Sequence, residues 1–348
     1  MPASFVAPSP TNIYIASAQA TGGLVVSHSR NPDDFPFTEY VKYMSVDKTK
    51  GFYKFYRAEN AARISQDMGA RYSWPHGGVR PTGFDAPELF RDQSYETFRI
   101  SFPYGHSEAE VEQADFDILA HSRAMVAQQL MTYRGVLIST ALQNADWSTY
   151  GNTSTATALS GGLWDAATAE NAYISLGLTK AIQSVKRATL GVAKFKDYRV
   201  VMNPNTAAKL GHSQEMHALY KQSVFAAALT ERDAKLFNEY GIPPVVAGLK
   251  IVVDDTVRIT SKDGASSLSS GYTIPDGKIY IVTRPGGIES TSGNIATSTV
   301  TMFYYKDEMT VFEKHDKDNE RYTGTVTQDV DIQVVDPRCG FEITNVTS

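Results

Sequence analysis

Residues 198–255 constrain the fold most, because they place strands, a sharp turn and helical segments in a fixed order. Residues 198–202 form a short apolar run that stops at Asn203-Pro204. Asn-Pro favours a turn, since the residue before a proline is kept out of the α region. Two helix-compatible segments follow, at 205–220 and 230–240. After them come a Gly-Ile-Pro-Pro turn at 241–244 and a β-branched run at 250–254. This order predicts a strand, helices and a second strand within one unit.

The C-terminal part of the chain is rich in predicted strands. Alternation of apolar and polar residues is clearest at 329–335, which indicates a strand with one wet face. The predicted strands are 278–283, 300–305, 310–313, 321–327 and 329–335, and residues 256–276 are expected to form an exposed tip loop. Helices first and strands later, without regular βα alternation, predict an α+β fold.

The segment 51–105 holds two strand-like arms, 52–57 and 95–102, around a middle that is rich in Gly and Pro. Long breaker-rich segments are uncommon inside a compact domain. Aromatic residues and arginines accompany the breakers here, and both types are enriched at protein–protein interfaces. We predict a projecting hairpin that completes its burial on a neighbouring subunit; a long loop folded back on its own domain is the alternative. The candidate interface residues are Arg63, Arg71, Tyr72, Trp74, Arg80, Phe84, Phe90 and Arg91.

Residues 107–142 predict the longest helix of the chain. Ser107 and Glu110 have the spacing of a capping box, and acidic residues crowd the first turns, where the helix dipole favours them. Apolar residues recur at helical spacing, at positions 116, 119, 126, 130, 133, 137 and 141. About 35 residues at 1.5 Å each would give a rod of about 50 Å. Gly135 is a position where it could bend or end.

Three further segments complete the pattern. The first residues of the chain are rich in Pro, Ser, Ala and Thr, and predict an extended arm with little core of its own. Residues 144–162 are rich in Ser, Thr, Ala and Gly, and predict a flexible connection. A second amphipathic helix is expected after Trp164, with apolar members from Ala172 to Val185.

Composition excludes some functions. The net charge of −5 argues against a nucleic-acid-binding surface, which normally needs a basic face. One cysteine, Cys339, allows no intrachain disulfide, and we expect a buried, inert thiol in a reducing compartment. The N-terminus lacks the basic and apolar regions of a signal peptide, and no apolar run is long enough to span a membrane.

No residue is nominated as catalytic, as a cofactor ligand or as a metal ligand. His212 and His217 are five apart, which puts them on different faces of a helix and disfavours a metal site. Asp316, Asp318 and Glu320 lack the glycine and the final glutamate of a calcium loop, so we expect a solvated charged turn. Phosphate-binding and nucleophile-elbow motifs are absent from the sequence.

Residues 201–210 and 241–255 resemble the tailed-phage major capsid proteins of the Hong Kong 97 type, and a weaker resemblance runs from about residue 45 to the C-terminus. The resemblance implies that family's α+β fold, in which a long spine helix follows a hairpin called the E-loop. It divides the chain into an N-terminal arm (1–50), the E-loop and its flanking strands (51–105), a P domain with the spine helix (106–175), an A domain (176–300) and C-terminal strands that return to the P domain (301–348).

The resemblance also implies a function. Many copies would form hexamers and pentamers that close, through a procapsid, into the icosahedral shell of a virion around double-stranded DNA, after assembly in the host cytoplasm. A separate scaffolding protein, a portal and a packaging motor are implied partners, with a decoration protein as a further one; the chain is too short before the E-loop for a fused scaffold. We predict no cross-link at Lys54, since nothing indicates a pairing residue. An encapsulin-like compartment shell and, less favoured, a soluble enzyme with a dispersed active site are the alternatives.

Overall fold

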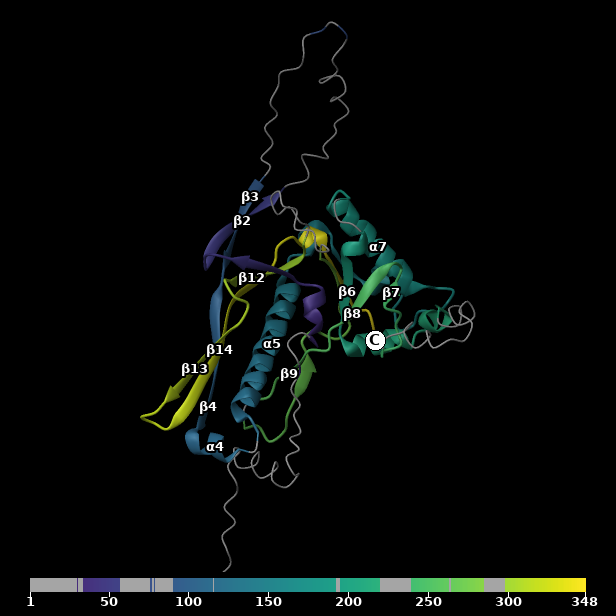
Figure 1. The fold of residues 1–348 in the computed structure, drawn as a ribbon. Helices are drawn as coiled ribbons and strands as arrows, with labels where there is room; N and C mark the ends of the chain where they lie inside the picture. Colours follow the sequence, from purple (N-terminus) through teal and green to yellow (C-terminus); the bar gives the residue numbers. More distant parts are fainter. Residues whose placement is uncertain are drawn as a thin grey trace, which may run out of the picture.

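The computed structural model describes residues 30, 34–56, 76, 78, 90–114, 116–191, 195–219, 239–262, 264–284 and 298–348 of the chain (Figure 1). Within them, strands and helices mix without βα alternation, so the prediction of an α+β fold is confirmed. Two sheets dominate the architecture, and a long helix, α5 (Ile118–Asn144), lies between them (Figure 1).

The first sheet is built around one long strand, β14. Its members are β1 (Lys42–Val46), β4 (Phe98–Ser107), β12 (Val300–Tyr305), β13 (Thr310–Asp316) and β14 (Arg321–Val334). Strand β4 pairs with one edge of β14, whereas β12 and β13 pair with successive halves of the other edge. Strand β1 adds to β12 in parallel. The two strands predicted at 321–327 and 329–335 are one continuous strand, because β4 pairs with β14 without a break from Arg321 to Val330.

The second sheet contains the strands that opened the sequence argument. Its order is β5 (Thr153–Thr155), β15 (Phe341–Thr344), β11 (Ile279–Thr283), β6 (Tyr198–Met202), β8 (Leu249–Val253) and β7 (Val245–Val246). Strands β6 and β8 are parallel neighbours, as a strand–helix–strand unit requires. One face packs on α7 (Tyr173–Ala188) and α8 (Pro204–Gly211), and the other face packs towards α5.

The Asn203-Pro204 dipeptide sets the start of α8. The Asn203 side chain accepts the Thr206 N–H at 2.8 Å as the N-cap, and Pro204 takes the first helical position, where no N–H is needed. The Asn203 amide also donates to the Ile274 carbonyl at 3.1 Å. The predicted turn is thus a helix cap that is bonded to a distant loop. The helix predicted at 230–240 lies outside the described residues.

The helix predicted at 107–142 is two helices. The capping box at Ser107 is present, but it starts only the short α4 (Glu108–Gln113). The chain becomes extended at Ala114, and Asp117 then caps α5 by accepting the Ala120 N–H at 2.9 Å. Helix α5 runs straight through Gly135, where a Cβ atom would lie 2.9 Å from the Thr256 side chain. Its 27 residues span about 40 Å, shorter than expected.

The buried face of α5 is also not the predicted stripe. Leu130 and Val126 are buried as expected, but Tyr133 is exposed and the face continues through Arg134, Ile138 and Leu142. Arg134 is fully buried because it pairs with the carboxylate of Glu308 and donates to Gln328 Oε1 at 2.9 Å. The predicted stripe was built from apolar residues alone, so it could not include an arginine that occupies a core position.

Two segments expected to lack a core are ordered and buried. Residues 34–41 were assigned to the arm, yet Phe35, Phe37, Tyr40 and Val41 belong to the core between the sheets. Tyr40 donates its hydroxyl to Asp254 at 2.6 Å, which ties this segment to the end of β8. The connection predicted at 144–162 contains β5 and α6 (Ala156–Ser160), because β5 pairs with β15 near the C-terminus.

The remaining differences concern loops and sheet membership. The tip loop expected at 256–276 contains a small exposed hairpin, β9 (Val257–Ile259) with β10 (Ser270–Tyr272), close to α5 (Figure 1). Strands β5 and β15 join the sheet of β6, so each sheet draws strands from both sides of the predicted boundaries at 175 and 300. The division into named domains stays a prediction.

We expect Asn203→Ala to lower the free energy of unfolding by about 2 kcal/mol, because it removes both a helix cap and a buried hydrogen bond. Asn205→Ala is the matched control: its side chain is exposed and reaches only Asp276, so we expect a change within about 0.5 kcal/mol. Urea denaturation of the two variants measures both values. Equal losses would show that Asn203 is not the residue that holds this turn.

Candidate subunit interface

The structure pairs the two strands at the base of the predicted hairpin. Strand β2 (Lys50–Tyr56) is antiparallel to β3 (Phe90–Glu96), in register from Lys50↔Glu96 to Tyr56↔Phe90; we call this pair the hairpin stem. The second arm was predicted at 95–102, but the chain breaks between β3 and β4 at Thr97. The Thr97 N–H still bonds to the Thr49 carbonyl at 2.8 Å, next to the Lys50↔Glu96 pair, and residues 98–102 of the predicted arm then belong to β4.

Two of the eight candidate interface residues lie on this stem. Phe90 and Arg91 open β3, where they pair with Tyr56 and Phe55 of β2. The other six are outside the described residues: Arg63, Arg71, Tyr72, Trp74, Arg80 and Phe84. Their role at an interface therefore stays a prediction. The stem itself exposes Phe52, which is 75% accessible beside the ion pair of Lys50 and Glu96.

One face of the stem packs on the first sheet, and Phe52 is exposed on the stem. A two-stranded hairpin needs such a packed face, because alone it is at best marginally stable in water. Figure 1 shows β2 and β3 at one end of the molecule, away from α4, β13 and the far ends of β4 and β14. The stem can therefore reach a neighbour without disturbing the core between the sheets.

The opposite end of the first sheet presents open edges. Among the described strands, β13 and β4 each pair only with β14, so each leaves a row of backbone donors and acceptors unpaired. Val311 pairs with Val326, which packs against α5, so the next residue, Phe312, points to the far face of the sheet. Phe312 is 65% accessible there. The adjacent apolar residues Val311 and Phe312 were not among the interface residues predicted from the sequence.

The far face of this sheet is polar around Phe312. Ser101 and Thr327 share a hydrogen bond of 3.0 Å across β4 and β14, and Arg99 pairs with Asp329 at 2.8 Å. Thr325 lies between Pro103 and Phe312 in the same row. A flat polar face with one exposed aromatic residue fits the rim of a protein interface better than a small-molecule site.

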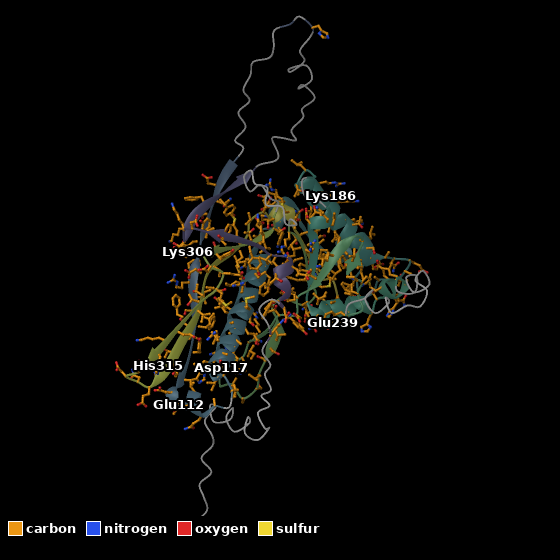
Figure 2. All side chains as sticks on the ribbon, viewed as in Figure 1. Glu112, Asp117, Lys186, Glu239, Lys306 and His315 are labelled. Carbon is orange, nitrogen blue, oxygen red and sulfur yellow. The ribbon has the colours of Figure 1, made fainter. Side chains whose placement is uncertain are left out.

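The distal end also holds a cavity of about 630 Å³ between β4, β14 and the start of α5. His106 and Ser122 line it, with Nε2 and Oγ 2.6 Å apart in a hydrogen bond. Glu110 lies 3.5 Å from His106 Nδ1, longer than a hydrogen bond, so the third member of a Ser-His-acid triad is not in place. The contact ties β4 to the first turns of α5. Figure 2 places Glu112, Asp117 and His315 at this same end.

The polar groups singled out in the sequence have structural roles. His212 and His217 are both exposed: His212 is the C-cap of α8, and His217 lies in the helical stretch 214–219, with the buried Glu215 between them in sequence. Glu215 accepts the N–H groups of Ile174 and Ser175 at 2.9 and 3.0 Å, and so caps α7, which has no cap of its own. In the part of the chain that the structure describes, no three His, Cys, Asp or Glu residues are grouped to hold a metal ion.

The charged turn at 316–320 is built as expected for a solvated turn. Asp316 accepts a hydrogen bond from Asn319 at 2.8 Å, and this bond lowers the pKa of the Asp316 carboxyl.

None of the described helices combines the length and the apolar character needed to cross a bilayer.

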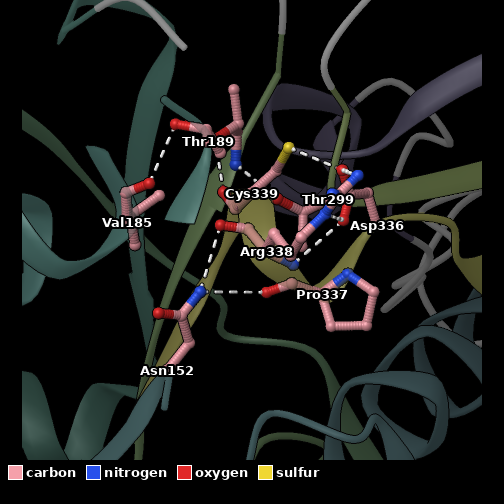
Figure 3. Close-up of polar contacts among 9 residues, drawn as sticks. Asn152, Val185, Thr189, Thr299, Asp336, Pro337, Arg338 and Cys339 are labelled. Carbon is pink, nitrogen blue, oxygen red and sulfur yellow. Dashed lines mark hydrogen bonds and ion pairs between the residues drawn. The ribbon is translucent and has the colours of Figure 1, made fainter. Parts of the chain in front are cut away.

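Cys339 is buried at the point where the chain passes from one sheet to the other (Figure 3). Its carbonyl accepts the hydroxyls of Thr283 and Thr299 at 2.5 and 3.0 Å, and its thiol donates to Asp336 at 3.3 Å. Asn152 donates to the carbonyls of Pro337 and Arg338 (Figure 3). Burial raises the pKa of the Cys339 thiol well above its usual value, and the nearby Asp336 adds to the effect.

Comparison with known proteins identifies the fold. No protein-family model matches the sequence, and no curated protein matches it. The capsid structure of cyanophage P-SCSP1u is similar over 92% of this chain and 90% of its own, with a TM-score of 0.57 and 11% identity. The mature capsid of bacteriophage PhiM1 is similar over the same shares of both chains, with a TM-score of 0.51 and 14% identity.

A third similar structure is a holo-SrpI encapsulin complex from Synechococcus elongatus PCC 7942. It covers 95% of each chain, with a TM-score of 0.50 and 11% identity. The predicted Hong Kong 97-type capsid fold is confirmed. The likeness to these capsid and encapsulin structures is one of fold.

We expect Cys339 to resist maleimide in the native protein and to react fully in denaturant, because the thiol is buried and kept protonated. A matched variant, Cys339→Ser with Lys314→Cys, places one exposed thiol on β13 and should react at once. Mass spectrometry of the two proteins follows the reaction. Rapid native labelling of Cys339 would contradict the buried junction between the sheets.

Proposed function

We propose that the chain is a shell subunit, the major capsid protein of a tailed phage. Many copies would form hexamers and pentamers that close into an icosahedral shell around double-stranded DNA. The observation that carries this proposal is the fold likeness to a cyanophage capsid structure over nine-tenths of both chains. Because the likeness covers 92% of the chain, no large part of this sequence needs a separate role.

The geometry of the subunit supports assembly through many separate contacts. The hairpin stem lies at one end of the molecule, and β13, with its open edge and the exposed Phe312, lies at the other end (Figure 1). Each such contact buries little area, and alone would be weak. In a closed shell every subunit makes all of them at once, so the assembly is stable although each contact is not.

The domains have separate roles in this proposal. The unit containing β6 and β8 would meet its copies at the centre of each hexamer or pentamer. The hairpin would lie across a neighbouring subunit, and the first residues of the chain would clasp others. A scaffolding protein, a portal, a packaging motor and a decoration protein are the proposed partners. The net charge of −5 suits a wall that holds DNA without binding it tightly.

An encapsulin-like compartment is the second candidate. The likeness to the SrpI encapsulin, at a TM-score of 0.50 over 95% of each chain, favours it specifically. The contents of the purified particles decide between the two. Double-stranded DNA protected from nuclease would support the capsid, and a co-purifying cargo protein without DNA would support the compartment.

We expect deletion of residues 66–90 to leave the subunit folded and to block shell closure, because β2 and β3 pair from Lys50↔Glu96 to Phe55↔Arg91 without them and the sequence predicts that they are buried on a neighbouring subunit. Circular dichroism melting tests folding, and electron microscopy with native mass spectrometry tests assembly. A deletion variant that builds normal shells would show that the hairpin is not an interface element.

We also expect Phe312→Ser to reduce shell formation while changing the free energy of unfolding by no more than about 0.5 kcal/mol, since the side chain is exposed. Lys314→Gln, on the same face of the same strand, is the control and should assemble normally. Sedimentation velocity measures the fraction of subunits in shells. Unchanged assembly of Phe312→Ser would remove this face from the proposed interface.

A further inference from the structure

The hairpin stem starts from two strands that are not neighbours. Strand β2 follows β1 after a three-residue bend, and β3 leads into β4 through Thr97. In the first sheet, however, β12 and β14 lie between β1 and β4. Three strand spacings of about 4.8 Å separate β1 from β4 by about 14 Å. The two arms of the stem must therefore converge over the face of the sheet before they can pair.

They converge over one cross-strand pair, Phe303 of β12 and Asp331 of β14. The rings of Tyr53 and Tyr95, one from each arm, stack on Phe303 with centroids 5.4 and 4.9 Å away and interplanar angles of 24° and 10°. Phe303 is 2% accessible, so the rings cover it. Gly51 completes the fit, because a Cβ atom there would lie 2.4 Å from the Tyr95 hydroxyl.

The polar half of this support is Asp331. Its Oδ2 atom accepts the backbone N–H of Glu96 at 2.9 Å and the side chain of Gln333 at 2.7 Å. Burial raises the pKa of Asp331, and it raises the pKa of the Tyr53 hydroxyl to about 12. Tyr53 and Asp331 are partly buried where the stem lies on the sheet, and the hydrogen bond from Glu96 attaches that arm of the stem to β14.

We propose that Phe303 and Asp331 are positioning residues that fix the angle at which the hairpin stem leaves the sheet, and that this angle sets the curvature of the shell. The first part stands on the geometry of the subunit, and the second part rests on the proposed function. The stem of seven residues is a lever of about 23 Å, so a turn of 10° at its base moves its far end by about 4 Å.

A spin-label distance measurement on the unassembled subunit tests the first part. Labels at Asp92→Cys on β3 and Lys314→Cys on β13 report the angle, and the buried Cys339 stays unlabelled. We call the stack of Tyr53 and Tyr95 on Phe303 the clamp. The unchanged protein, with its clamp intact, should give one narrow distance distribution. Tyr95→Leu should broaden that distribution or shift it by roughly 2 Å, the displacement at position 92 for a turn of 10°.

Two further variants separate the clamp from general destabilisation. Phe303→Leu removes the ring from the sheet side, and should have the same effect as Tyr95→Leu if the stack sets the angle. Phe52→Leu is the matched control, because it changes an aromatic residue on the same stem that is exposed and outside the stack. Folding of each variant is checked by thermal melting. Narrow, unshifted distributions in folded Tyr95→Leu and Phe303→Leu would overturn the clamp.

Electron microscopy of assembled Tyr95→Leu tests the second part. We expect a wider range of shell diameters than in the unchanged protein, or open sheets. Shells of uniform, unchanged diameter, formed from subunits whose label distances have broadened, would overturn the link to curvature and leave the clamp standing. Failure of the unchanged protein to form shells would instead count against the proposed function, since the label distances do not depend on assembly.

Discussion

Burial of α5 by both sheets is the constraint on which the rest of the structure depends. Met131, Ile138 and Leu142 lie in one core with Val201 and Tyr280 of the second sheet. The same core takes in Val300, Met302 and Val330 of the first sheet. Each fully buried aliphatic side chain contributes about 1.5–3 kcal/mol, so the shared helix couples the two sheets strongly. The shared helix therefore joins the two sheets into one packed unit.

Two of the crossings of the chain between the sheets, from β11 to β12 and from β14 to β15, meet at one hydrogen-bonded point. Thr283 ends β11 in the second sheet, Thr299 precedes β12 in the first, and both hydroxyls bond to the Cys339 carbonyl between β14 and β15. Gly340 stands at this junction because a Cβ atom there would meet Trp147 and the Ile281 carbonyl at 2.8 and 2.9 Å. Two crossovers thus share one set of hydrogen bonds, which holds the sheets at a fixed relative position.

Compact apolar runs in the sequence predicted several strands correctly. The features that the sequence did not predict depend on contacts between residues far apart in the chain. Residues 198–202 and 300–305 form strands with those bounds, since each is a compact apolar run. The buried face of α5 was missed because Arg134 and Gly135 occupy it, and only Glu308, Gln328 and Thr256, from other elements, make them fit. For the interface, the first arm of the hairpin could be predicted from its strand-like run, but the second arm was placed too late in the chain, because residues 98–102 belong to β4 and pair with β14. The support on Phe303 could not, because it depends on strand order in the sheet.

The most direct test of the account is cryo-electron microscopy of the unchanged protein, with particle mass measured on the same sample. The account predicts closed shells, or rings of five and six subunits, in which the hairpin of each subunit lies against a neighbour and Tyr53 and Tyr95 remain stacked on Phe303. A homogeneous monomer or small oligomer that does not assemble, even with a candidate scaffolding protein present, would contradict it.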